Sequence, residues 1–187
     1  MKFFKWTLLT IVILLFSGLI FRGWLYRQFF SYKTIGQRTE YNATDKRLTD
    51  YIDAKTKDSK PTDINDIINL SLGLTSDGLN FREAKNDNDP NKLVKSKNAH
   101  CVGYSAFFST TCNYLLTKYD YADSWTSKAL IGQIYFCGTN IHRYFNSAFF
   151  KDHDFNSIEN KQTGEKYFVD PTVNDYLSIN LVTEKMK

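Results

Sequence analysis

Residues 96–116 read SKNAHCVGYSAFFSTTCNYLL, a stretch that begins with polar residues and then stays largely apolar over the length of a buried helix. Asn98 is a suitable N-cap for such a helix, because its side-chain oxygen can accept from the unpaired backbone N–H groups of the first turn. Cys101 would then lie in that first turn, where the helix dipole favours a thiolate and lowers the pKa of the thiol. The stretch predicts a central helix with a candidate nucleophile at its start.

The chain as a whole has the composition of one domain with an aromatic core. Its 187 residues include 15 Phe and 12 Tyr, so a few large side chains can fill the interior. The net charge of +4 is small, and both signs are mixed along the chain, which argues against nucleic acid as a partner. The three cysteines are too few for a disulfide framework and lack metal-binding spacing. Cys112 and Cys137 are interpreted as core residues, although one pair among the three cysteines could still form a disulfide.

The N-terminal residues predict a membrane segment. The stretch from Phe3 to Phe21 is almost wholly apolar, and Trp24 and Tyr26 are suited to the membrane interface that would follow it. Its uninterrupted part is shorter than the ~20 residues that a spanning helix needs. We interpret residues 1–27 as an uncleaved anchor of a single-pass membrane protein. The alternative, a cleaved signal peptide, is less favoured because no small-residue cleavage site follows. The side of the membrane stays open, because the flanking charges conflict with the usual export of such chains.

Most of the remaining chain is interpreted as one domain, over residues 44–187, after a connector over residues 28–43 that has no clear periodicity. Apolar residues recur at helical spacing in residues 44–57 and 61–74, which predicts two helices. Residues 86–91 are rich in Asn and Asp and predict a loop. Calcium binding there is disfavoured, because the glycine and the distal glutamate of a calcium loop are absent.

The last third of the chain favours strands. Residues 128–144 are rich in β-branched and aromatic residues and predict a strand that ends at Gly138. Residues 153–159 and 166–169 alternate as strands do, with a turn-forming stretch between them, so they predict an antiparallel hairpin. The hairpin ends at Asp170, because the proline that follows cannot continue a ladder.

This hairpin would place His153 beside Asp170. A cysteine nucleophile needs an imidazole within hydrogen-bond reach, and the imidazole needs an acceptor on its other nitrogen. Cys101, His153 and Asp170 supply these three roles in chain order. His142 is a rival base, but no acidic partner follows it, so it is interpreted as a surface or strand histidine.

Three motifs carry a family resemblance. Residues 101–105 (CVGYS) resemble the start of the nucleophile helix of transglutaminase-like domains, residues 153–156 (HDFN) their histidine strand, and residues 167–172 (YFVDPT) their aspartate strand. The similarity covers about residues 98–173. It implies a papain-like α+β fold, in which the nucleophile helix packs on an antiparallel sheet, and a Cys101–His153–Asp170 triad.

The resemblance also implies the surroundings of the site. Gly103, Tyr104 and Phe155 are expected at the substrate cleft, where Gly103 would allow close packing. Two positions depart from the family pattern, since His100 replaces a smaller or aromatic residue and Phe155 replaces a tryptophan. Neither a metal nor a cofactor is expected.

The sequence therefore favours a membrane-anchored transglutaminase-like thiol enzyme. It would act on amide or peptide bonds of a peptide or protein substrate through an acyl-enzyme intermediate, by hydrolysis in preference to cross-linking. The alternative is a catalytically inactive module that uses the same cleft to bind a peptide or protein partner at the membrane surface.

Overall fold

Seven α-helices, two short 3-10 helices and seven strands make up the described part of the chain, residues 2–84 and 86–185 of the computed structural model. The helices are α1 (Lys2–Ile20), α2 (Arg22–Phe29), α3 (Lys46–Lys55), α4 (Ile64–Gly78), α5 (Pro90–Ser96), α6 (Cys101–Lys118), α7 (Pro171–Leu177), η1 (Ile141–Tyr144) and η2 (Ala148–Phe150). The strands are β1 (Phe30–Gln37), β2 (Asn80–Phe81), β3 (Asn98–Ala99), β4 (Trp125–Phe136), β5 (Thr139–Asn140), β6 (His153–Asn160) and β7 (Lys166–Val169).

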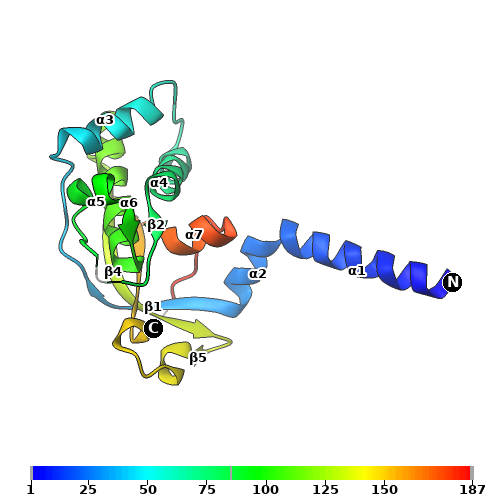
Figure 1. The fold of residues 1–187 in the computed structure, drawn as a ribbon. Coiled ribbons are helices and arrows are strands. Elements are labelled where there is room, and N and C mark those ends of the chain that lie inside the picture. The colour runs from blue at the N-terminus through cyan, green and yellow to red at the C-terminus, as the bar shows by residue number, and fades with distance from the viewer. Residues whose placement is uncertain (1, 85, 186–187) are drawn as a thin grey trace.

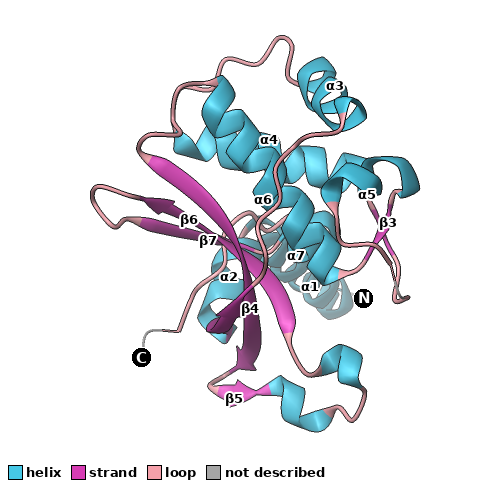
Figure 2. Cartoon of the chain, turned by 90° about the vertical axis from the view of Figure 1, so that its left-hand side faces the viewer, coloured by secondary structure: helices cyan, strands magenta, loops and turns pink. Residues whose placement is uncertain are grey.

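The architecture is a layer of helices on one antiparallel sheet, so the expected α+β class is confirmed. The sheet has five strands in the order β1-β4-β6-β7, with β5 paired to β4. Helix α6 lies against β4 and β6, and α4 packs on α6 (Figure 2). Strands β2 and β3 form a separate, parallel pair.

Helix α6 is buried on nearly all sides, because the sheet covers one face and α4 and α7 cover the others. Two hydrogen bonds fix its first turns on β6. The hydroxyl of Ser105 donates to the carbonyl of Phe155 (3.1 Å), and the amide of Asn156 donates to the carbonyl of Ser105 (2.9 Å). The start of α6 is thereby held against the start of β6.

The predicted hairpin is confirmed. Strands β6 and β7 pair antiparallel, with Asn156 opposite Val169 and Glu159 opposite Lys166. Asp170 follows β7 directly and also caps α7, since its carboxylate accepts from the backbone N–H groups two and three residues ahead. The short helix α7 was not expected from the sequence.

The expected connector over residues 28–43 requires a correction, because residues 30–37 form strand β1. This strand pairs with β4, and its register shifts between Thr34 and Gly36. The backbone of Tyr32 also pairs with the C-terminal segment, donating to the carbonyl of Thr183 and accepting from the N–H of Lys185. The side chain of Tyr32 is fully buried.

Two helix starts also differ from expectation. Helix α6 begins at Cys101 as expected for the first turn, but its N-cap is His100 and not Asn98, whose side chain donates to the carbonyl of Ser96. Helix α4 begins at Ile64 after the cap Asp63 and continues to Gly78, so it starts and ends later than the predicted range 61–74.

Helices α1 and α2 form the N-terminal part of the chain, and α1 projects away from the rest (Figure 1). The described side chains of α1 are mostly exposed and apolar. Within the described residues, none of the helices alone combines the length and apolarity needed to cross a membrane. The pair Leu9–Ile20 and Arg22–Phe29 does so jointly, by length and composition, with a bend of 76°.

Gly132→Ala is expected to destabilise the sheet. A Cβ atom at Gly132 would lie 2.4 Å from Cε1 of Phe155, a ring that is fully buried and stacked near Tyr32. Overpacking of this kind costs about 1–3 kcal/mol, which urea denaturation can measure. The matched control is Gly73→Ala, in open space within α4, which should stabilise the chain by about 0.5–1 kcal/mol. Equal stability of the two variants would contradict the close contact in the sheet.

Candidate active site

Cys101 is the first residue of α6 and is almost buried, with 8% of its surface exposed. The residue before it, His100, caps the helix, because its Nδ1 accepts from the backbone N–H of Val102 at 3.3 Å. The sulfur therefore lies at the positive end of a long helix, where a thiolate is favoured.

His153 and Asp170 are in direct contact, as the hairpin prediction requires. His153 begins β6 and Asp170 ends β7, and the ring Nε2 lies 2.6 Å from the carboxylate Oδ2. The ring is pointed by this contact, which leaves Nδ1 as the nitrogen that can exchange a proton with Cys101. The side chain of His153 remains slightly exposed, whereas that of Asp170 is fully buried.

The buried carboxylate of Asp170 is held from three elements. Its Oδ1 accepts from the backbone N–H groups of Thr172 (3.0 Å) and Val173 (3.1 Å) in α7. Its Oδ2 accepts from the hydroxyl of Tyr32 in β1 (2.8 Å) as well as from His153. A buried charge is stable only when it is paired and hydrogen-bonded, and here both oxygens have donors.

The surroundings of Cys101 favour its thiolate. Burial is the largest influence and raises the pKa, but hydrogen bonds with His100 and His153, the charge of His153 and the backbone N–H of Asp154 together lower the pKa of the thiol to about 6. Burial of His153 lowers the pKa of its imidazole, yet the charge and hydrogen bond of Asp170 and the contact with Cys101 raise it well above its usual value. The pair therefore favours thiolate and imidazolium at neutral pH.

A buried ion pair lies next to these groups. Asp154 follows His153 in β6 and is fully buried, and its carboxylate receives two hydrogen bonds from the guanidinium of Arg38, at 2.8 and 2.9 Å. The positive charge of Arg38 is within electrostatic range of Cys101. This bidentate pair fixes the segment that carries the N–H group of Asp154 toward the sulfur.

Three residues near the sulfur and the carboxylate were not assigned to the site from sequence. Tyr32 and Arg38 come from the segment that was interpreted as a connector, and the alternating burial of β1 is the signal that could have revealed Tyr32. His100 was weighed only as a metal ligand. It instead caps α6, contacts the thiol and meets the ring of Phe149 edge-on, with centroids 5.9 Å apart.

The expected cleft residues are packing residues in the structure. Gly103 lets α6 approach β3 closely, since a Cβ there would lie 2.7 Å from Cβ of Ala99. Tyr104 is fully buried and donates to Asp175 in α7 at 2.9 Å. Phe155 is fully buried in the sheet. Tyr104 and Phe155 are thus held in the core, so neither is exposed to a substrate.

The other candidate residues divide differently from expectation. Cys112 is buried as expected, and burial raises the pKa of its thiol to about 12. Cys137 was expected in the core but is exposed, because β4 has ended and its backbone turns with φ +46°. His142 was expected at the surface or in a strand but is buried in η1. Its two ring nitrogens contact the N–H of Ile134 and the carbonyl of Phe150.

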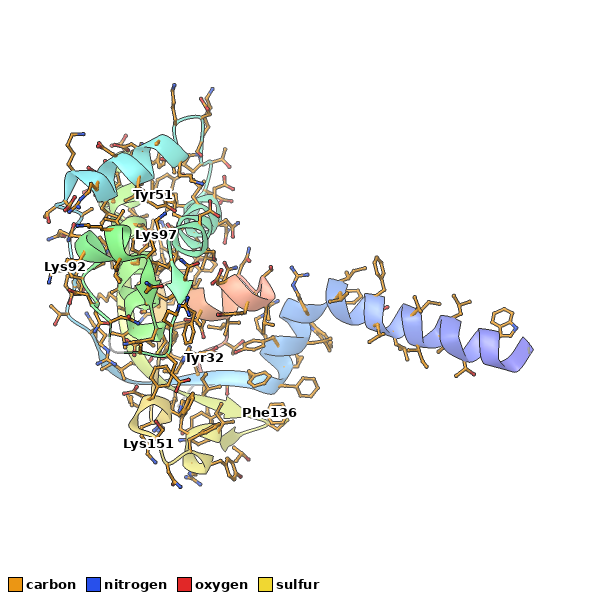
Figure 3. All side chains as sticks on the ribbon, in the orientation of Figure 1. Tyr32, Tyr51, Lys92, Lys97, Phe136 and Lys151 are labelled. Atoms are coloured by element: carbon orange, nitrogen blue, oxygen red, sulfur yellow. The ribbon has the colours of Figure 1, made fainter. Side chains whose placement is uncertain are left out.

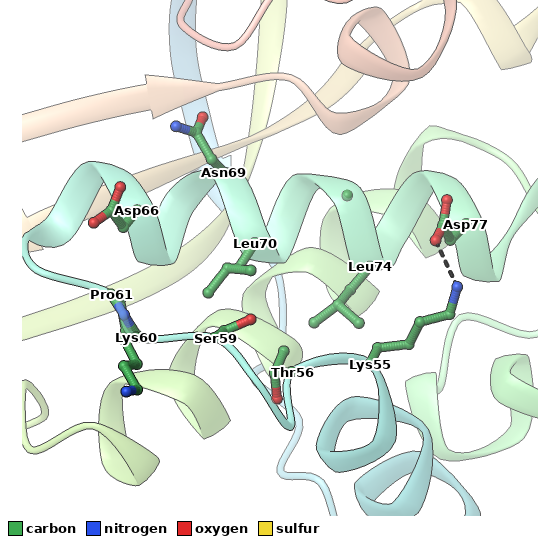
Figure 4. Close-up of a pocket in the computed structure, with 11 residues that line it drawn as sticks. Lys55, Thr56, Ser59, Lys60, Pro61, Asp66, Asn69, Leu70, Leu74 and Asp77 are labelled. Atoms are coloured by element: carbon green, nitrogen blue, oxygen red, sulfur yellow. Dashed lines mark hydrogen bonds and ion pairs between the residues drawn. The ribbon is translucent and has the colours of Figure 1, made fainter.

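A hollow of about 540 Å³ lies between α3 and α4, away from Cys101 (Figure 4). Its lining includes the ion pair of Lys55 and Asp77 but neither cysteine nor histidine, so it offers no thiol chemistry. Among the residues that the structure describes, three or more His, Cys, Asp or Glu side chains nowhere gather as a metal site would require.

Comparison of the chain with protein-family models, with curated proteins and with solved structures gives no match.

Proposed function

We propose that the chain is a transglutaminase-like thiol enzyme that hydrolyses amide or peptide bonds through Cys101, His153 and Asp170. The observation that carries the proposal is the 2.6 Å contact between His153 and Asp170, together with a thiol whose pKa is lowered to about 6 by its contacts with histidine. Nucleophile, base and orienting acid are the three parts that thiol catalysis needs.

In the first half of the proposed reaction, the thiolate of Cys101 attacks the carbonyl carbon of an amide. The backbone N–H of Cys101, at the start of α6, donates to the oxyanion that forms. The C–N bond then breaks, and the imidazolium of His153 gives its proton to the leaving nitrogen, which departs as an amine. A thioester between Cys101 and the acyl group remains.

In the second half, water attacks the thioester carbon while His153 accepts one proton from that water. The C–S bond breaks, the acid product leaves, and the thiolate and imidazolium are restored. An amine in place of water would make the same intermediate a cross-linking reaction. We favour hydrolysis, because the domain is small and carries no evident module for a second substrate. Metal ions and cofactors have no part in these steps.

The papain-like fold belongs to the same proposal. A helix that begins with the nucleophile and packs on an antiparallel sheet is the arrangement that the family resemblance implies, and α6 on β4 and β6 is compatible with it. The exposed apolar side chains of α1 support a further part, in which the N-terminal helices hold the enzyme at a membrane.

Alkylation with iodoacetamide tests the activated thiol. In the folded protein Cys101 should react with a pH midpoint near 6, because the thiolate is the reacting form. In the urea-unfolded chain its midpoint should return to about 8.5, the usual thiol value. Mass spectrometry of the labelled peptides separates the three cysteines, and buried Cys112 should remain unlabelled while the chain is folded. A folded Cys101 that titrates like the unfolded thiol would refute the proposal.

Turnover of a panel of fluorogenic peptide amides tests the reaction itself. Intact-mass analysis should show an acyl adduct on the wild type, and Cys101→Ala should lose both adduct and turnover. His153→Ala should lower the rate by about 100-fold or more, the usual contribution of a general acid–base group.

The matched control is Cys137→Ser, which changes an exposed thiol remote from the reacting groups and should keep full activity. Binding of peptides with equal affinity by wild type and Cys101→Ala, without adduct or turnover, would instead identify the non-catalytic binding module.

A further inference from the structure

A row of hydroxyl groups connects helix α2 to the carboxylate of Asp170. The hydroxyl of Tyr26 in α2 lies 2.7 Å from that of Tyr32, and the hydroxyl of Tyr32 donates to Oδ2 of Asp170 at 2.8 Å. A phenol has one proton to donate. Tyr32 uses its proton on Asp170, so Tyr26 is the donor in the contact between the two tyrosines.

The row ends at the oxygen that also holds His153. Oδ2 of Asp170 lies 2.6 Å from Nε2 of His153. Tyr32 is fully buried, and Figure 3 places it where β1 passes α7. Hydrogen bonds in such a buried series polarise one another, so the loss of one donor alters the next contact.

A second contact holds α2 against the same helix that Asp170 caps. The guanidinium of Arg22 donates to the carbonyls of Leu177 and Ser178, at 2.8 and 3.2 Å, at the C-terminal end of α7. Helix α2 therefore meets α7 at its far end through Arg22 and approaches its cap through the two tyrosines.

We propose that Tyr26 and Tyr32 are positioning residues of the thiol site, so that α2 is a working part of the site as well as a link to α1. The inference rests on the proposed function, because it assigns the two hydroxyls a role in holding Asp170 toward His153. With both donors present, the carboxylate is fixed in rotation, and the imidazolium keeps the partner that stabilises it beside the thiolate. Without Tyr32, Oδ2 keeps His153 alone and the carboxylate can turn.

The test is the pH profile of Cys101 alkylation by iodoacetamide in the full chain, measured for Tyr32→Phe and Tyr26→Phe. Each variant removes one oxygen atom and keeps the ring. In Tyr32→Phe the midpoint should rise by at least half a pH unit toward the ordinary thiol value, since a turned carboxylate supports the imidazolium less well. In Tyr26→Phe, one bond further away, the shift should be smaller and in the same direction.

The matched control is Tyr51→Phe, which removes a hydroxyl that donates to the carbonyl of Leu74 at 2.7 Å, away from Asp170. It loses a hydrogen bond of similar quality and should leave the midpoint unchanged. A purely structural role of the two tyrosines would lower stability in all three variants without moving the titration, and that result would overturn the inference.

Asp170→Asn separates the two levels of the proposal. A midpoint that moves in Asp170→Asn but stays at the wild-type value in folded Tyr32→Phe and Tyr26→Phe would overturn the role of the tyrosines alone. A midpoint that stays in Asp170→Asn would overturn the three-residue site itself. If Tyr32→Phe does not fold, the half-buried Tyr26 carries the test.

Discussion

The carboxylate of Asp170 is the constraint on which the arrangement of the fold depends. It is fully buried, and a buried charge without partners would destabilise the folded state by several kcal/mol. Its donors come from β6, from β1 and from the first turn of α7. Satisfying this one group therefore requires the hairpin, the N-terminal strand and the last helix to be in place together.

A second set of contacts brings the sulfur to that group. Ser105 and Asn156 bind α6 to β6 through each other's chain, one turn after Cys101 and a few residues after His153. The ion pair of Arg38 and Asp154 holds the same stretch of β6 from its other neighbour. The thiol pKa depends on these supports, because the histidine and the N–H group that lower it are carried by elements that they fix.

Local sequence patterns were sufficient for the parts of the fold that local forces determine. Alternation and a turn predicted the β6–β7 hairpin, and with it the contact of His153 with Asp170. The role of Tyr32 could not be read in the same way, because its strand pairs with residues far along the chain and its register shifts beside Gly36. The burial of His142 and the exposure of Cys137 likewise depend on how the chain turns back on β4, which side-chain type alone does not encode.

The pairing of Tyr32 with Thr183 and Lys185 has a consequence for the time at which the protein matures. A strand near the start of the chain waits for residues near its end, so this contact closes almost the longest loop that the chain can form. During synthesis, when the N-terminal part emerges first, the N-terminal strand lacks this partner until translation is nearly complete. A ribosome-bound chain thus carries its cysteine for most of its synthesis before the sheet that surrounds it can close.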